Sequence, residues 1–240
     1  MKRMMFFFAA AAAIVSGCGY NPGCECGTLL LDRTDSLHAV QTVVLTDVKR
    51  LIPVEQDATL GGRLAVRTIG DVRTTQSHIT EIVSHSGGGA NDYLRGGECE
   101  RFFESAGANL EEAKRGIHPL KKSYVVHSIL AAMDDLAEAP GCKRKRCIVV
   151  SDLAENSDLF SVYSQKEIDL LEHHPEQLIG KINKAYPRTL SYEGIEVFFV
   201  HEGSMADDTR FYLMSKLLSD FLSSRSATVH APVGSIDEVR

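Results

Sequence analysis

Apolar runs that end in polar residues mark the predicted strands of this chain. Residues 28–32 read Thr-Leu-Leu-Leu-Asp, and an unbroken apolar run suits a central strand that is covered on both faces. A second strand is predicted at residues 146–150, where an arginine is followed by four apolar residues that lead into Ser151 and Asp152. Alternating or apolar patterns predict further strands at 62–69 and 193–200, and a weaker one at 77–83.

Apolar residues at helical spacing lie between these strands. The clearest stripe covers 124–138, where we expect Ser123 to act as the N-cap. We predict other helices at 36–51, 98–116, 177–185 and 207–222. Because strands and helices alternate, the predicted fold class is α/β, with a doubly wound, mostly parallel sheet flanked by helices.

The N-terminal stretch has the pattern of an export signal. Lys2 and Arg3 precede a short apolar segment, and Val15-Ser16-Gly17-Cys18 resembles the bacterial lipobox, in which the cysteine is lipidated. We therefore expect a lipoprotein signal peptide at 1–17, a lipid-anchored linker at 18–27, the folded domain at 28–222 and a loose polar tail at 223–240. Gly19 favours the outer membrane if the organism is Gram-negative.

The charge balance limits the classes of partner. The formal net charge is −6, and it becomes more negative once Lys2 and Arg3 are removed with the signal. This balance argues against a nucleic-acid partner and against adhesion to anionic lipid through a basic face. We expect contact with the membrane through the N-terminal lipid alone.

Six cysteines are present, and export predicts disulfides among those that remain after lipidation of Cys18. Cys142 and Cys147 flank a basic stretch and could staple it as a turn. Cys99 could also bond Cys24 or Cys26. Since five cysteines remain, at least one thiol has no partner within the chain. A metal site at Cys24-x-Cys26 lacks the usual spacing of structural zinc sites.

Oxygen-bearing side chains follow the first predicted strand. Asp32, Thr34 and Ser36 form D-x-T-x-S, a set of hard ligands of the kind that Mg²⁺ or Mn²⁺ prefers. The alternative is a capping cluster at the start of the next helix. Asp152 lies at a second strand end, and in a parallel sheet it can share an edge with Asp32.

These motifs, in this order, resemble a von Willebrand factor type A (vWA) domain. Asp32-Arg33-Thr34-Asp35-Ser36 is similar to the family's D-x-S-x-S motif, and Ser151-Asp152-Leu153 is similar to its T-D-G element, with Leu153 in place of glycine. Ser123 lies where the family has a threonine ligand. The resemblance implies a metal-ion-dependent adhesion site that binds Mg²⁺ or Mn²⁺ through Asp32, Thr34, Ser36, Ser123 and Asp152. An open position on the ion would accept an acidic group from a protein partner.

The sequence therefore predicts a lipid-anchored, extracytoplasmic binding module in an envelope or surface assembly. One alternative is a metal-assisted hydrolase in which Asp32 and Asp152 hold a Mg²⁺-bound water, although no general base or nucleophile stands out. Another is a structural interaction domain with a degenerate metal site. Glu155 either supports the site or caps the segment that follows it, and we expect His173 and His174 to be exposed connector residues.

Overall fold

The computed structural model describes residues 23–32, 37–57, 59–70, 77–85, 92–115, 122–187, 190–201 and 209–239. The predicted signal peptide, Cys18, Thr34 and Ser36 lie outside these residues. No helix of the described part of the chain is long and apolar enough to cross a membrane.

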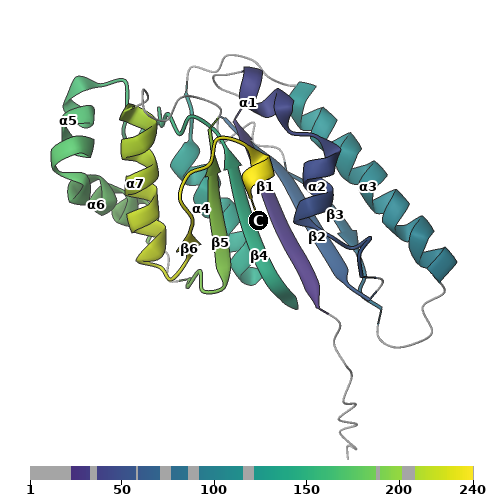
Figure 1. Cartoon of the computed structure of the whole chain (residues 1–240). Helices are drawn as coiled ribbons and strands as arrows, with labels where there is room; N and C mark the ends of the chain where they lie inside the picture. Colours follow the sequence, from purple (N-terminus) through teal and green to yellow (C-terminus); the bar gives the residue numbers. More distant parts are fainter. Residues whose placement is uncertain are drawn as a thin grey trace, which may run out of the picture.

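A six-stranded sheet forms the centre of the molecule (Figure 1). Its strand order is β3-β2-β1-β4-β5-β6. Neighbouring strands are parallel except for β2 and β3, which are antiparallel. The strands are β1 (Cys24–Asp32), β2 (Gly61–Ile69), β3 (Ser77–Ile82), β4 (Cys142–Val150), β5 (Ile195–Val200) and β6 (Thr228–Val229). The predicted α/β class with a mostly parallel sheet is confirmed.

Helices cover both faces of the sheet. One face packs against α4 (Val125–Glu138), α5 (Gln165–His173), α6 (Pro175–Ala185) and α7 (Thr209–Ser223). The other face packs against α1 (Leu37–Thr42), α2 (Leu45–Leu51) and α3 (Asp92–Arg115), and also against the short 3₁₀ helix η1 (Ile236–Glu238). Successive residues of β1 alternate between the two cores: Leu30 joins the first, whereas Leu29 and Leu31 join the second. An unbroken apolar run is therefore what this central strand requires.

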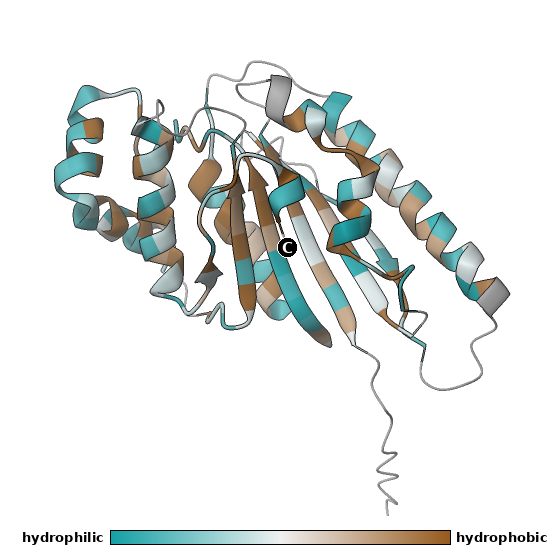
Figure 2. Cartoon of the chain, in the orientation of Figure 1, coloured by the Kyte–Doolittle hydropathy of each residue, from teal (hydrophilic) through white to brown (hydrophobic). Residues whose placement is uncertain are grey.

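Three of the predicted elements differ from the structure in their bounds or number. The predicted helix 36–51 is two helices, and Asp47 starts the second by accepting a hydrogen bond from the backbone N–H of Val44 at 2.8 Å. The predicted linker 18–27 includes the first four residues of β1. Strand β4 begins at Cys142 rather than at 146, because its basic amino half continues the pairing with β1 (Figure 2).

The segment after α7 is not the loose tail that its polar composition predicts. Strand β6 pairs with β5, and the backbone N–H of Val233 donates to the carbonyl of Phe199 at 3.0 Å. Ile236, the first residue of η1, is buried in the second core. Backbone pairing with an open sheet edge, which polarity patterns do not reveal, orders this segment.

The predicted disulfide between Cys142 and Cys147 is wrong. Cys142 is bonded to Cys26, across β4 and β1, with Cα atoms 5.8 Å apart. Cys142 and Cys147 lie on the same extended strand, where five residues span about 16 Å, beyond the reach of a disulfide. Cys24, Cys99 and Cys147 are free thiols, so the predicted bond from Cys99 to Cys24 or Cys26 is also wrong.

We expect Cys142→Ser to lower the free energy of unfolding by about 3 kcal/mol. The Cys26–Cys142 bond joins positions 116 residues apart, and loops of this size restrict the unfolded chain strongly. Urea denaturation of the oxidised protein, wild type against variant, measures the difference. Cys99→Ala is the control, because Cys99 takes part in no disulfide. Equal stability of Cys142→Ser and wild type would contradict a structural role for the bond.

Candidate metal site at the carboxyl ends of β1 and β4

The strand order of the sheet reverses direction between β1 and β4. From β1 the chain builds outward to β2 and β3 on one side, and to β4, β5 and β6 on the other. In doubly wound sheets, ligands bind at the carboxyl ends of the two strands where this reversal occurs. Asp32 is the last residue of β1, and Ser151 and Asp152 directly follow β4. The structure therefore places β1, which ends at Asp32, beside β4, which is followed closely by Asp152.

Asp32 and Ser151 are in direct contact. The register pairs Leu31 with Val150, so the residues that follow them, Asp32 and Ser151, lie opposite each other. The hydroxyl of Ser151 donates to Oδ2 of Asp32 at 2.5 Å, and both residues are buried, with exposed fractions of 5% for Asp32 and 2% for Ser151. Ser151 is not among the predicted site residues. The signal for it was its position one residue before Asp152, at the end of an apolar strand.

Asp152 lies in a tight turn that its own side chain stabilises. Its Oδ1 accepts a hydrogen bond from the backbone N–H of Ala154 at 2.8 Å, while the N–H of Leu153 donates to the hydroxyl of Ser151 at 2.8 Å. Leu153 has a φ of 58°, in the left-handed region that favours glycine. This is the position at which the vWA pattern has glycine. The Leu153 side chain is buried in the core beneath the turn.

Ser123 is held beside the segment that follows Asp152. Its backbone N–H donates to the carbonyl of Asn156 at 3.0 Å, and its carbonyl accepts from the N–H of Asn156 at 2.9 Å. The N–H of Tyr124 donates to the carbonyl of Gly70, just beyond β2. Ser123 is buried, but the prediction that it caps α4 is wrong, because Tyr124 occupies the N-cap position.

Glu155 performs the capping instead. Its side chain is 1% exposed, and Oε2 accepts a hydrogen bond from the backbone N–H of Val126 in the first turn of α4, at 2.8 Å. Burial raises the pKa of Glu155 to about 7; the hydrogen bonds from Ser157 and Val126 oppose this rise, and the charge of Asp32 adds to it. The prediction that Glu155 caps the segment after it is therefore wrong, because the helix that it caps is the preceding α4.

The described part of the site is rich in oxygen donors. Asp32, Ser123, Ser151, Asp152 and Glu155 come from β1, from the turn before α4 and from the segment after β4. Carboxylates and hydroxyls suit Mg²⁺ or Mn²⁺, and a divalent cation offsets the cost of burying negative charge. These residues are therefore of the chemical kind that the predicted ion prefers. Among the described residues, however, Asp32, Asp152 and Glu155 do not form a group with ligand atoms close enough together to hold an ion; the one such group is Cys24, Cys26 and Cys142. Of the other predicted ligands, Thr34 and Ser36 lie outside the described residues.

Two groups of histidines do not belong to this arrangement. His173 and His174 are exposed at the junction of α5 and α6, as connector residues are expected to be. His201, just after β5, stacks on the ring of Phe211 with centroids 4.3 Å apart.

Comparison of the sequence with models of known protein families finds no match, and comparison with curated proteins finds none either. The function of the site must therefore be argued from its own geometry.

We expect Glu155 to make stability depend on pH. Its pKa in the folded state is about 7 against an ordinary 4.5, so between these values the folded state binds more protons than the unfolded state. Stability should therefore fall as pH rises from about 4.5 to 7, by about 3 kcal/mol for a shift of this size. Urea denaturation across this range, with a chelator present, should show the slope in the wild type.

Glu155→Gln keeps an acceptor for the N–H of Val126 but cannot ionise. Its stability relative to the wild type should rise by the same amount over that pH range. Parallel pH profiles of the wild type and this variant would contradict the raised pKa.

Proposed function

We propose that this protein is a lipid-anchored, extracytoplasmic binding module, similar in design to a vWA domain, that engages a protein partner through a divalent cation. The observation that carries the proposal is the buried contact between Asp32 and Ser151 at the switch point of the sheet, beside Asp152. This is the place in the fold where a ligand site is expected on topological grounds.

Asp32, Ser123 and Asp152 would hold the cation, together with Thr34 and Ser36 of the motif that follows β1. Bound Mg²⁺ or Mn²⁺ would supply Lewis acidity and an open coordination position for a carboxylate of the partner. The hydrogen bond from Ser151 orients Asp32, and the turn at Leu153 presents Asp152 at the same edge. Binding of this kind requires no chemical step, which agrees with an arrangement made of ligands rather than of an acid–base pair.

Side chains suited to a protein interface lie at the same end of the sheet. Tyr163, in the segment that connects β4 to α5, is 57% exposed. Arg210, in the first turn of α7, lies over its ring at 5.5 Å. An exposed tyrosine supplies contact area at low entropic cost, and the arginine offers a positive charge to an acidic partner.

The anchor and the site would lie at opposite ends of β1. Cys18 precedes the start of β1 by six residues, which span at most about 20 Å, so the amino edge of the sheet would face the membrane. Strand β1 then runs nine residues, about 30 Å, to Asp32. The proposed metal site would therefore face away from the lipid, toward a partner.

Addition of Mg²⁺ or Mn²⁺ to the chelator-treated domain should raise its Tm by about 5 °C at saturation, because the ion binds only the folded state. Asp32→Asn should abolish this shift while keeping an acceptor for the Ser151 hydroxyl. Asp169→Asn, at an exposed position of α5, is the matched control and should shift like the wild type. If neither Mg²⁺ nor Mn²⁺ changes the Tm of the wild type, the result would support a degenerate site and contradict metal-dependent binding.

Cys18→Ser should release the full-length protein from membranes, because the thiol is the predicted point of lipid attachment. Fractionation of cells into membrane and soluble material, followed by detection of the protein, measures the change. Cys99→Ala keeps the predicted lipidation motif and should stay with the membrane. Retention of Cys18→Ser in the membrane fraction would contradict the lipid anchor.

A further inference from the structure

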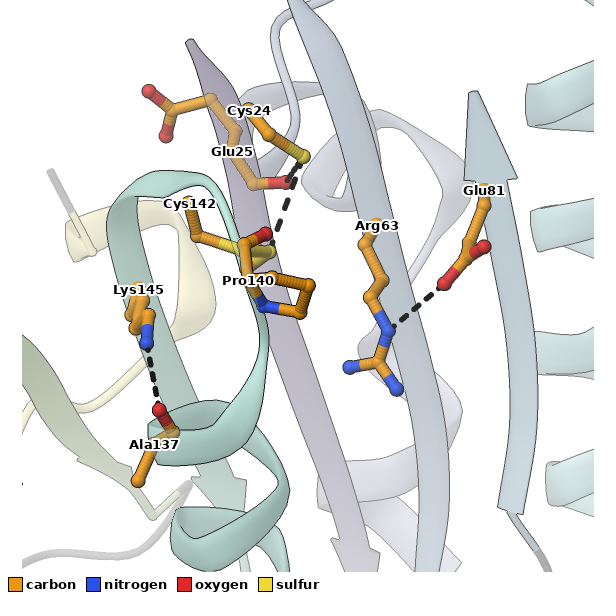
Figure 3. The surroundings of a disulfide bond; sticks show 9 residues. Cys24, Glu25, Arg63, Glu81, Ala137, Pro140, Cys142 and Lys145 are labelled. Atoms are coloured by element: carbon orange, nitrogen blue, oxygen red, sulfur yellow. Dashed lines mark hydrogen bonds and ion pairs between the residues drawn. A yellow bond between two sulfur atoms is a disulfide. The ribbon is translucent and has the colours of Figure 1, made fainter. Parts of the chain in front are cut away.

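A second cluster of chemically active side chains lies at the opposite end of the same two strands. The sulfur atoms of Cys24, Cys26 and Cys142 all lie within 4.8 Å of one another. Cys26 and Cys142 form the disulfide, and the free Sγ of Cys24 is 4.0 Å from Sγ of Cys26. Figure 3 shows the Cys24 sulfur directed toward the disulfide rather than away from the sheet. A thiol beside a disulfide is the arrangement from which thiol–disulfide exchange proceeds.

The register of the strands gives Cys142 two candidate partners. Cys24 is the direct Cα partner of Cys142 across β1 and β4, whereas the direct partner of Cys26 is Lys145. The observed bond to Cys26 is therefore diagonal, with Cα atoms 5.8 Å apart. Neighbouring strands lie about 4.8 Å apart, so directly paired cysteines also fall within the Cα range of a disulfide. A β-bulge between Cys24 and Glu25 marks the place where the pairing shifts.

We propose that these three cysteines form a disulfide-exchange site, in which Cys142 bonds alternately with Cys26 and Cys24. The thiolate of Cys24 attacks Sγ of Cys142, and the Cys24–Cys142 bond forms as the Cys26–Cys142 bond breaks. The electron pair of the broken bond leaves on Sγ of Cys26, which takes up a proton. One disulfide and one thiol are present before and after, so no oxidant or reductant is consumed.

Exchange would change which thiol the surroundings can reach. Cys24 is half-buried, whereas Cys26 is 1% exposed and belongs to the core beneath α4. With Cys142 bonded to Cys26, the free thiol is the accessible one and can form a mixed disulfide with an external thiol compound. With Cys142 bonded to Cys24, the free thiol is enclosed and inert. At the amino ends of β1 and β4, exchange thus determines whether the free thiol is the accessible Cys24 or the buried Cys26.

Charged groups around Cys24 set the rate of exchange. Burial raises the pKa of the Cys24 thiol, and Glu25 on its own strand and Glu81 on β3 raise it further, while Arg63 on β2 lowers it. Arg63 is bound to Glu81 at 3.0 Å, and on the β4 side the stem of Lys143 lies over Gly23. Because the thiolate is the attacking species, exchange should accelerate about tenfold per pH unit below the Cys24 pKa.

The decisive experiment removes one partner at a time from the otherwise intact chain. Each variant is oxidised in air, denatured in the presence of N-ethylmaleimide so that free thiols are blocked as they become exposed, and digested without reduction by a protease that cuts after glutamate. Cleavage after Glu25 separates Cys24 from Cys26, so mass spectrometry assigns each disulfide. Cys24→Ser should contain Cys26–Cys142, and Cys26→Ser should contain Cys24–Cys142. Full alkylation of both Cys24 and Cys142 in folded Cys26→Ser would overturn the proposal.

Two further measurements guard against a misfolded variant. The wild type, incubated at pH 9 and then quenched with acid and maleimide, should yield alkylated Cys26 as well as alkylated Cys24; alkylation confined to Cys24 would contradict exchange. In urea, Cys26→Ser should keep a midpoint closer to the wild type than Cys142→Ser does, because only Cys142 is needed by both disulfides. Cys99→Ala should behave like the wild type throughout, since Cys99 lies on the other face of the sheet.

Discussion

The parallel pairing of β1 with β4 is the constraint on which the rest of the structure depends. Its register sets Leu31 against Val150 at one end and Cys24 against Cys142 at the other. Residues more than a hundred positions apart are thereby brought together twice, as the buried Asp32–Ser151 contact and as the Cys26–Cys142 disulfide. Both faces of this strand pair are covered by helices, so a register slip would disrupt both cores at once.

The two ends of the strand pair have different chemistry. Carboxylates and hydroxyls lie at the carboxyl end, where burial raises the pKa of the Glu155 carboxyl. Thiols gather at the amino end, beside basic residues of β4 (Figure 2). If the chain is anchored through Cys18, the sulfur cluster lies near the membrane and the oxygen cluster faces outward. The sheet would then lie between the lipid anchor and the proposed partner-binding site.

Two features near the proposed metal site depart from the usual conformational preferences of the chain. A buried leucine occupies a left-handed backbone position after Asp152, and α4 begins without a capping side chain at its N-cap residue. Glu155 compensates for the second by capping α4 from a distant segment, but only with its own carboxyl buried. Departures of this kind are expected to gather at binding sites, because ligand geometry competes there with the preferences of the chain.

The sequence by itself determined the fold class. Short apolar runs indicate buried strands, apolar residues at helical spacing indicate helices, and the two alternate along the chain. It also placed Asp32 and Asp152 at strand ends, since Asp32 directly follows an apolar run and Asp152 follows one after the single residue Ser151. Only the tertiary structure decided that Cys26 bonds Cys142, because disulfide reach depends on the register between distant strands. It likewise decided that Glu155 caps α4, that Ser151 contacts Asp32, and that residues after α7 complete the sheet. These contacts join segments distant in sequence, and no local pattern encodes them.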